Sequence, residues 1–260
     1  MDNPLDYTGR VVLVTGGTRG IGRGIAARYE SAGATVVVCG RTAPAAPGPG
    51  PGPAPGPGSF VACDVRDPDS VSSLVARVAE QHGRLDVAVN NAGGAPWADS
   101  ATASPRFNEK VLALNLLAPF TVAQAAYGVM SSQPGGGAIV NIASVSGTRP
   151  SPGSAAYGAA KAGLLNLTQT LAVEWAPASV RVNAVVAGLI ATEASDVTYG
   201  SAETQARVAA TVPLGRLGTP SDVAEACLWL SSPAAAYVTG AILTVHGGNE
   251  RPAWLSAFDS

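Results

Sequence analysis

A tyrosine and a lysine four positions apart, Tyr157 and Lys161, have the side chains needed to move a proton to or from an oxygen atom. On a helix, residues four apart lie on one face, one turn from each other. A phenol titrates at about pH 10, so alone it is a poor acid or base at neutrality, but a neighbouring ammonium favours the phenolate and lowers its pKa. We therefore expect Tyr157 to exchange a proton with an alcohol or carbonyl oxygen, and Ser144 to hold that oxygen by a hydrogen bond.

The glycine-rich stretch at residues 15–22 is the second feature with functional chemistry. Its glycines at positions 16, 20 and 22 can adopt positive φ angles and let the backbone approach a ligand closely. N–H groups at the start of the helix that follows, together with the helix dipole, favour a pyrophosphate. The dinucleotide pattern G-x-G-x-x-G is not met, because Ile25 stands at the third glycine position. The stretch alone leaves both a nucleotide site and a plain strand-to-helix turn open.

The elements that must position these residues alternate between strand-like and helix-like patterns from end to end. Short β-branched apolar runs predict strands that are buried on both faces, as in parallel sheets. The alternation predicts a single α/β domain over residues 1–260, with a doubly wound (Rossmann) seven-stranded parallel sheet. The expected strands are residues 10–15, 35–39, 60–64, 85–90, 138–144, 181–186 and 241–245, and the expected helices are residues 21–32, 69–82, 107–130, 157–175, 201–210 and 220–231.

Composition excludes several other classes of protein. The 260 residues carry a net charge of −2, whereas nucleic-acid-binding domains usually carry a basic excess. Hydrophobic residues make up 47%, which excludes a disordered chain. Charged residues make up only 13%, against about 25% in typical proteins. Much of this chain must therefore be buried in the fold, in a subunit interface, or in both.

The cysteines and histidines do not have the spacing of a metal site or a disulfide framework. Cys39, Cys63 and Cys227 are widely spaced and odd in number, so we expect small buried side chains in a reducing compartment. His82 and His246 each precede a glycine and are expected to be non-catalytic. No metal is expected.

The stretch between Lys110 and Arg149 has no charged residue and could suggest a membrane span. Pro119 and Gln124 interrupt its apolar part, and a Pro-Gly-Gly-Gly sequence ends it. A spanning helix needs about 20 mostly apolar residues, so a buried helix, a loop and a buried strand fit better. The acidic, turn-like N-terminus lacks the basic and apolar regions of a targeting segment, so we expect a soluble, cytoplasmic protein.

Two segments depart from the alternation. Residues 42–58 contain 7 Pro, 5 Gly and 4 Ala, which can neither continue a helix nor pair as a central strand. We expect an extended or disordered loop in place of a helix. Because it has no aromatic or charged anchor, a passive spacer is favoured over a docking segment for a partner. The tail, residues 249–260, contains Trp254, Leu255 and Phe258 and is expected to pack on the fold or on a neighbouring subunit, where it could border the partner's active site.

Five motifs in one order resemble the short-chain dehydrogenase/reductase family, in particular its single-domain branch of carbonyl reductases similar to 3-oxoacyl-ACP reductases. Ser144 precedes Tyr157 by 13 positions, the spacing usual in the family. The resemblance covers the chain apart from residues 42–58 and about the last dozen residues. The motifs are Thr15-Gly-x-x-x-Gly-x-Gly22, Cys63-Asp64-Val65, Asn90-Asn91-Ala92-Gly93, Asn115, and Ser144 with Tyr157-x-x-x-Lys161.

The resemblance implies a role for each matching residue. Tyr157 would be the general acid/base, with Ser144 holding the reacting oxygen. Lys161 would also bind the nicotinamide ribose, and Asn115 would position a water in the proton relay. The implied cofactor-binding residues are Gly16, Thr18, Arg19, Gly20, Ile21, Gly22, Arg41, Asp64, Val65, Asn90, Ala92, Gly93, Tyr157, Lys161, Gly188, Ile190 and Thr192.

Some of these positions have more specific implied roles. Asp64 would accept a hydrogen bond from the adenine amine, and Asn90 would steady the central sheet and the cofactor. Asp86 and Asn91 are expected to be structural. Ala187 stands where the family usually has a proline before the nicotinamide-binding turn, which leaves that turn looser.

The end of the second expected strand bears on the choice of cofactor. An NAD-preferring site needs an acidic side chain there to accept hydrogen bonds from the ribose 2′-OH. Gly40 occupies that position, Arg41 follows it, and Arg19 projects from the glycine turn. Both arginines resemble the basic positions of NADP-using relatives and could hold a 2′-phosphate. NADP(H) is therefore the expected cofactor, with NAD(H) as the alternative if both arginines point into solvent.

Together these features predict an oxidoreductase that transfers a hydride between NADP(H) and a carbonyl or secondary alcohol of a small or medium apolar substrate. The alternative is a catalytically idle dinucleotide-binding sensor or scaffold of the same fold, which the complete Ser-Tyr-Lys set disfavours. An epimerase or dehydratase fits less well, because such family members resemble longer chains with an added lobe. Trp97 and Tyr199 are the candidate substrate walls, and residues 193–214 would close over the substrate.

The expected helices at residues 111–130 and 157–175 have apolar faces that a monomer this poor in charge would struggle to cover. Family members that resemble this chain are commonly tetramers built on these two helices and the last strand. We expect a homotetramer, with a dimer as the alternative, and no nucleic-acid or membrane partner.

Overall fold

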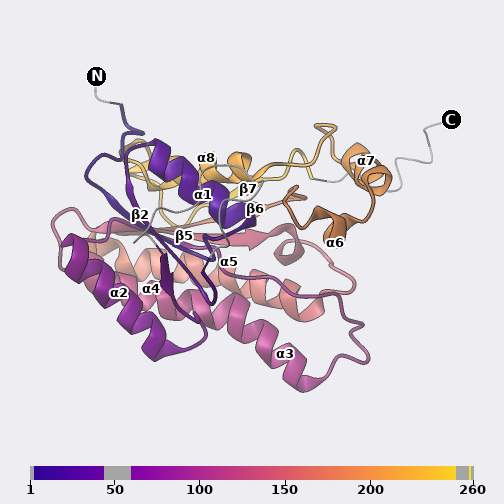
Figure 1. Ribbon diagram of the computed structural model, residues 1–260, viewed down its shortest axis with the longest axis horizontal. Coiled ribbons are helices and arrows are strands. Elements are labelled where there is room, and N and C mark those ends of the chain that lie inside the picture. The colour runs from indigo at the N-terminus through magenta and orange to yellow at the C-terminus, as the bar shows by residue number, and fades with distance from the viewer. Residues whose placement is uncertain (1–2, 44–59, 250–257, 259–260) are drawn as a thin grey trace.

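The computed structural model of the chain describes residues 3–43, 60–249 and 258 (Figure 1). Seven parallel strands form one sheet in the order β3-β2-β1-β4-β5-β6-β7, which confirms the expected doubly wound α/β fold. The order reverses between β1 and β4, and sheets of this kind bind ligands in the crevice at the carboxyl ends of such strands. Most of the expected spacer at 42–58 and of the tail at 249–260 lies outside the described residues. The strands are β1 (Val11–Thr15), β2 (Thr35–Gly40), β3 (Phe60–Ala62), β4 (Val87–Asn90), β5 (Gly137–Ser144), β6 (Val180–Ala187) and β7 (Ile242–Val245).

The central strands consist mostly of apolar, β-branched residues, and these residues are buried. Every residue of β1 and β4 is buried, because helices cover both faces of the sheet, as the continuous apolar runs predict. β3 ends at Ala62, two residues before the expected end. There the chain turns, and the Asp64 side chain accepts a hydrogen bond from the Arg66 N–H at 3.1 Å, which closes the turn.

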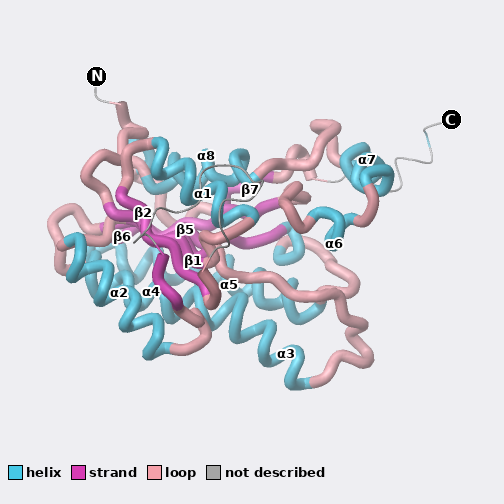
Figure 2. The backbone as a smooth tube through the Cα atoms, in the orientation of Figure 1, coloured by secondary structure: helices cyan, strands magenta, loops and turns pink. Residues whose placement is uncertain are grey.

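Two layers of helices enclose the sheet (Figures 1 and 2). Helices α1 and α8 lie against one face, and α2, α4 and α5 lie against the other. Helices α6 and α7 project beyond the sheet on one side, and α6 was not expected from the sequence. The helices are α1 (Gly20–Ser31), α2 (Pro68–His82), α3 (Pro105–Leu112), α4 (Ala118–Met130), α5 (Ala155–Trp175), α6 (Ser195–Tyr199), α7 (Ala202–Thr211) and α8 (Pro220–Ser231), with short 3₁₀ turns η2 (Val145–Gly147), η3 (Ala176–Ala178) and η4 (Pro233–Ala235).

The helix expected at residues 107–130 is a continuous helical run with a π-helical turn, η1 (Ala113–Leu117), between α3 and α4. Such turns insert one extra residue and often occur at functional sites. By length and composition alone, the run Pro105–Met130 could cross a membrane. Its α4 part is instead a core helix, because Val122, Ala126 and Met130 pack in the hydrophobic core against the sheet.

The starts of α8 and α1 differ in a way that matters for ligand binding. α8 begins with a capping box, in which the Thr219 N–H donates to the Asp222 carboxylate at 2.7 Å and Thr219 Oγ1 accepts from the Asp222 N–H at 3.3 Å. At the N-cap of α1 stands Arg19, whose side chain makes no capping hydrogen bond, and the first turn has no acidic residue. The sequence around α1 therefore leaves its first N–H groups without a local cap.

Candidate active site

Ser144 is the last residue of β5, and Tyr157 and Lys161 lie one turn apart near the start of α5. The Ser144 hydroxyl lies close enough to Tyr157 to lower its pKa, and Lys161 Nζ lies 5.7 Å from the centre of the Tyr157 ring. Lys161 is only 3% exposed and donates a hydrogen bond to the Ile142 carbonyl at 2.8 Å. The structure thus brings the three residues together at the carboxyl end of β5.

Burial controls the ionisation of both titratable residues in this group. It lowers the pKa of the Lys161 ammonium from 10.5 to about 8. Burial raises the pKa of Tyr157 above 10.0, while the hydrogen bond with Ser144 acts in the opposite direction. This corrects the expectation that Lys161 lowers the Tyr157 pKa. In the chain by itself, the ammonium donates to the Ile142 carbonyl, and the loss of hydration of the Tyr157 hydroxyl sets the direction of its pKa shift.

Asn115 lies in the π-turn η1 and is fully buried. Its Oδ1 accepts from the Gly94 N–H at 2.8 Å, and its Nδ2 donates to the carbonyls of Gly94 and Val111 at 3.0 and 2.9 Å. A Cβ on Gly93 would lie 2.8 Å from Asn115 Oδ1 and 3.3 Å from Lys161 Nζ, so a glycine is needed there. Asn115 therefore anchors the loop after β4 directly beside Lys161; its role in positioning a water stays a prediction.

Asn90 begins a chain of buried amides across the middle of the sheet. Its Nδ2 donates to Asn141 Oδ1 on β5 at 2.9 Å and to the Pro119 carbonyl at 3.1 Å. Asn141 Nδ2 in turn donates to Thr168 Oγ1 on α5 at 2.9 Å. The side chains thus tie β4 and β5 to α4 and α5, which agrees with the expected steadying role of Asn90.

Two of the three glycines expected to have positive φ angles in the turn after β1 have them, whereas Gly22 lies within α1 and does not. Gly16 and Gly20 have φ angles of +64° and +54°. Asn91 Nδ2 donates to the Thr15 and Gly16 carbonyls at 2.9 and 3.2 Å, which gives Asn91 the structural role expected of it. A Cβ on Gly22 would clash with Asn91 Nδ2, so this close approach requires glycine. The amide side chain therefore fixes the turn from the side of β4.

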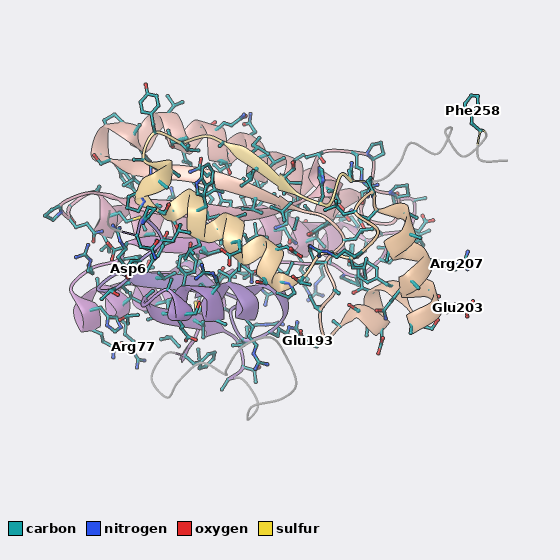
Figure 3. The ribbon with its side chains drawn as sticks, turned by 90° about the horizontal axis from the view of Figure 1, so that it is seen from above. Asp6, Arg77, Glu193, Glu203, Arg207 and Phe258 are labelled. Atoms are coloured by element: carbon teal, nitrogen blue, oxygen red, sulfur yellow. The ribbon has the colours of Figure 1, made fainter. Side chains whose placement is uncertain are left out.

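A contact that no sequence pattern predicts joins this turn to the segment between β6 and α6. The Gly20 N–H donates a hydrogen bond to Glu193 Oε1 at 2.7 Å, although the two residues lie 173 positions apart. Glu193, labelled in Figure 3, is exposed. The long separation and the variable character of such loops explain why the sequence gives no signal for this contact.

The expected adenosine end of the site has an ion pair that the sequence interpretation missed. Arg66 Nε donates to Asp64 Oδ1 at 2.9 Å, and Arg66 Nη2 lies 2.5 Å from Asp64 Oδ2. Arg66, with a smaller contribution from the nearby Arg41, lowers the pKa of the Asp64 carboxyl to about 2. Arg41 and Arg19 are both exposed, and Gly40 places no carboxylate between them and a ligand. The exposed guanidiniums of Arg41 and Arg19 are therefore accessible to a ligand at this end of the crevice.

The turn after β6 is held in place although Ala187 replaces the usual proline. A Cβ on Gly188 would lie 2.6 Å from His246 Cβ, so glycine lets β6 and the residues after β7 approach each other. Ile190 pairs with Gly218, whose carbonyl accepts a hydrogen bond from the Ala191 N–H at 2.8 Å. These contacts replace part of the rigidity that a proline would give.

The two candidate substrate walls lie in different places. The Tyr199 hydroxyl donates to the Ile190 carbonyl at 3.3 Å, and burial together with the nearby Tyr157 raises the pKa of Tyr199. Tyr199 therefore lies next to the Ser-Tyr-Lys group. Trp97 packs over Gly153, where a Cβ would clash with the indole nitrogen, and Trp97 is 74% exposed.

A cavity of about 310 Å³ adjoins Tyr157 on the side of α3. Phe107 and Val111 of α3 face it from one side, and Pro96 and Ala98 of the loop after β4 face it from another. Its described lining includes neither a charged side chain nor Trp97 or Tyr199. The cavity therefore favours uncharged, carbon-rich groups.

The other expected cofactor residues follow the carboxyl ends of strands, which meet at one edge of a parallel sheet. Across the residues that the structure places, no group of three or more His, Cys, Asp or Glu side chains could hold a metal ion. Thr18 and Ile21 follow β1, Val65 follows β3, Ala92 and Gly93 follow β4, and Thr192 follows β6.

Comparisons with known proteins agree with this geometry. Residues 16–250 match the family model described as Enoyl-(Acyl carrier protein) reductase. The chain is 37% identical over 245 residues to L-rhamnose 1-dehydrogenase (NAD(P)(+)) from Azotobacter vinelandii, covering 92% of this chain and 96% of the relative. It is 37% identical over 243 residues to a 3-oxoacyl-(acyl-carrier-protein) reductase from Chlamydia muridarum, with 92% and 96% covered. The crystal structure of a short-chain type dehydrogenase/reductase from Mycobacterium marinum superimposes with a TM-score of 0.83 at 30% identity, covering 95% of this chain and 98% of that one.

Proposed function

The chain belongs to the short-chain dehydrogenase/reductase family of oxidoreductases, and from that premise we propose that it interconverts a carbonyl group and a secondary alcohol on a small or medium, largely apolar substrate with NADP(H). The observation that carries this proposal is the Ser144–Tyr157–Lys161 group at the carboxyl end of β5. A buried ammonium, a phenol and a hydroxyl within one small volume have a clear use in proton transfer to oxygen.

The residues around the crevice fit a dinucleotide. Gly16 and Gly20 have positive φ angles, and Gly93 leaves room beside Lys161 and Asn115 that a Cβ would fill. The start of α1 has N–H groups without a local cap, which suits a pyrophosphate. When bound, the nicotinamide supplies or accepts the hydride.

The side chains then manage the proton and the oxygen. In the direction of reduction, the Tyr157 hydroxyl donates its proton to the carbonyl oxygen as the hydride arrives at carbon, and the Tyr157 oxygen is left as a phenolate. Ser144 donates a hydrogen bond to the same oxygen and so orients it. Lys161 stabilises the phenolate by its positive charge, which it carries below a pH of about 8. Oxidation of the alcohol reverses these steps.

The preference for NADP(H) rests on the charges at the adenosine end. Gly40 offers no carboxylate to a ribose 2′-OH and none to repel a 2′-phosphate. Arg41 lies close enough to Asp64 to lower the pKa of its carboxyl, so its guanidinium is near the expected adenine contact. Arg41 and Arg19 are exposed and so accessible to a phosphate dianion.

The apolar substrate class rests on the cavity beside Tyr157. A substrate whose reacting carbon lies at the Tyr157 hydroxyl would extend its apolar part between α3 and the loop after β4. At about 310 Å³ the cavity lies at the small end of the usual range for ligand sites. We accordingly place carboxylates and polyols below neutral ketones and alcohols of similar size.

The test is the loss of NADPH absorbance across a panel of ketones, with Tyr157→Phe as the control variant. Tyr157→Phe keeps the ring and removes the proton donor, so the rate on the best ketone should fall by at least about 100-fold. NADPH binding to the variant, measured by calorimetry, should remain. An unchanged rate would remove Tyr157 from the proposed role, and tight NADPH binding without turnover of any ketone or alcohol would replace the enzyme by an idle dinucleotide-binding protein.

Two exposed apolar areas support the proposed homotetramer. Leu117 of η1 and Val173 of α5 are 57% and 78% exposed on one side of the molecule, whereas Trp229 of α8 and Ile242 of β7 belong to another. Two separate self-complementary faces build a tetramer with three perpendicular twofold axes. We also propose a cytoplasmic location, since the apolar residues of α4 face the core.

A further inference from the structure

The hydrogen bond between Glu193 and Gly20 places a carboxylate at the point where the glycine turn meets α1. Glu193 Oε1 accepts from the Gly20 N–H at 2.7 Å, which is a short, charge-assisted bond. Glu193 belongs to the segment between β6 and α6, so it reaches α1 from the side of the crevice that carries the expected nicotinamide turn. In Figure 3 it lies well apart from Glu203 and Arg207 of α7.

The start of α1 attracts this carboxylate because the helix has no local cap. Arg19 at the N-cap makes no side-chain hydrogen bond to the helix, and its first turn has no acidic residue. The N-terminal N–H groups and the helix dipole therefore favour an anion, whichever group supplies it. The Glu193 carboxylate offers the same chemistry as a phosphate oxygen: a negatively charged acceptor aimed at a backbone N–H.

We propose that Glu193 competes with the cofactor pyrophosphate for the start of α1 and thereby sets the affinity for the dinucleotide. The inference rests on the proposed function, which places the pyrophosphate at the same N–H groups. Two anions cannot share this position without strong repulsion, so Glu193 must leave when a dinucleotide binds. Each binding event then breaks the Glu193–Gly20 hydrogen bond. The measured affinity is reduced in proportion to the fraction of molecules in which Glu193 has left the start of α1.

The test measures dissociation constants by isothermal titration calorimetry with the full chain and three variants. Glu193→Gln removes the charge and keeps the shape, and Glu193→Ala removes the acceptor. Glu203→Gln is the matched control, because Glu203 is also exposed, gives the same change in net charge and lies on α7. Thermal unfolding of each variant confirms that it is folded.

Glu193→Ala should bind NADPH about 10-fold more tightly than the wild type, the value of roughly one charge-assisted hydrogen bond, and Glu193→Gln, which keeps an uncharged acceptor, should gain by a smaller factor. NADH and ADP-ribose should gain by the same factor, because all three ligands carry the pyrophosphate. Binding of 2′-AMP, which lacks the pyrophosphate, should not change, and Glu203→Gln should leave all four affinities as in the wild type.

Unchanged or weaker NADPH binding in both Glu193 variants would overturn the proposal, since Glu193 would then be a cap that the bound cofactor retains. An equal gain in Glu203→Gln, or an equal gain for 2′-AMP, would also overturn it, because the effect would then be one of overall charge. If neither the wild type nor any variant binds NADPH or NADH, the proposed function itself fails. If the wild type binds both cofactors and the Glu193 variants bind them with the same affinity, only the Glu193 proposal fails.

Discussion

Replacing Lys161 by methionine should make the protein more stable, because burial of the ammonium lowers the stability of the folded chain. The same change should make it a much poorer catalyst, because the positive charge beside Tyr157 is lost. Lys161 is 3% exposed, and burial lowers its pKa from 10.5 to about 8. The difference, at about 1.4 kcal/mol per pKa unit, corresponds to a penalty of about 3 kcal/mol for the charged form in the folded protein. Methionine has a similar length, fills irregular space and carries no charge.

The free-energy penalty for burying the Lys161 ammonium depends on pH, and its direction follows from the pKa values of Lys161 in the folded and unfolded chain. The unfolded chain keeps the Lys161 proton up to pH 10.5, whereas the folded protein releases it at about pH 8. The penalty is therefore complete below pH 8, shrinks as the pH rises from 8 to 10.5, and is absent above that range. Loss of the hydrogen bond to the Ile142 carbonyl offsets about 1 kcal/mol of the gain. Lys161→Met should thus raise the free energy of unfolding by about 2 kcal/mol at pH 7. This excess should shrink as the pH rises above 8 and change sign before pH 10.5, where only the loss of the hydrogen bond, about 1 kcal/mol, is left.

The assay is urea denaturation followed by circular dichroism at pH 7, 8.5 and 10, with all proteins at one concentration because subunit association adds to apparent stability. The control is Lys110→Met, since Lys110 is the chain's other lysine and is exposed on α3. The buried tyrosines and cysteines ionise alike in every variant, so their effects cancel in the comparison. A Lys161→Met protein that is less stable than the wild type at pH 7, or whose excess does not change with pH, would refute the reasoning.

Two further predictions concern the cofactor and the assembly. NADPH should be preferred over NADH by at least about 10-fold in kcat/KM; Arg41→Ala should remove most of this preference with the NADH rate nearly unchanged, whereas Arg77→Ala on the outer face of α2, labelled in Figure 3, should leave it intact. Equal use of both cofactors by the wild type would show that the arginines do not bind a phosphate. Light scattering at working concentration should give four times the 25.8 kDa chain mass. A mass of 25.8 kDa would refute any assembly, and twice that mass would mean that only one of the two apolar areas forms a subunit interface.

The sequence predicts the sheet well because burial on both faces imposes one simple pattern. The runs that became β1, β2, β5 and β6 are continuous and apolar, and their observed bounds differ from the expected ones by one residue at most at either end. The pattern fails where no face is buried along the element. α6 is only five residues long and lies between β6 and α7, so it shows no detectable periodicity. The π-turn η1 lies within a longer apolar run whose pattern predicts a regular α-helix throughout.

In the candidate site, too, the sequence predicts the features set by local geometry and misses those that depend on distant segments. Local geometry accounts for the spacing of Tyr157 and Lys161 along one helix and for the place of Ser144 at the end of a strand. The structure therefore brings together the three residues that the sequence analysis singled out. Interactions that depend on distant segments do not follow. The partner of Lys161 is a carbonyl on β5, and the burial that raises the Tyr157 pKa comes from the packing of distant segments, which the spacing alone does not show.

Glu193 extends this argument from ionisation to binding. A helix start that lacks a local cap can be recognised in the sequence, since Arg19 stands where Ser, Thr, Asp or Asn usually caps. What the sequence cannot say is which anion satisfies it, because the cofactor and a carboxylate 173 positions away are chemically equivalent at that N–H. A cap omitted by the local sequence is thus both the basis of a phosphate site and the reason that a distant side chain can compete for it. The affinity of such a site is then set in the loop after β6, where the sequence is free to vary without disturbing the glycine turn.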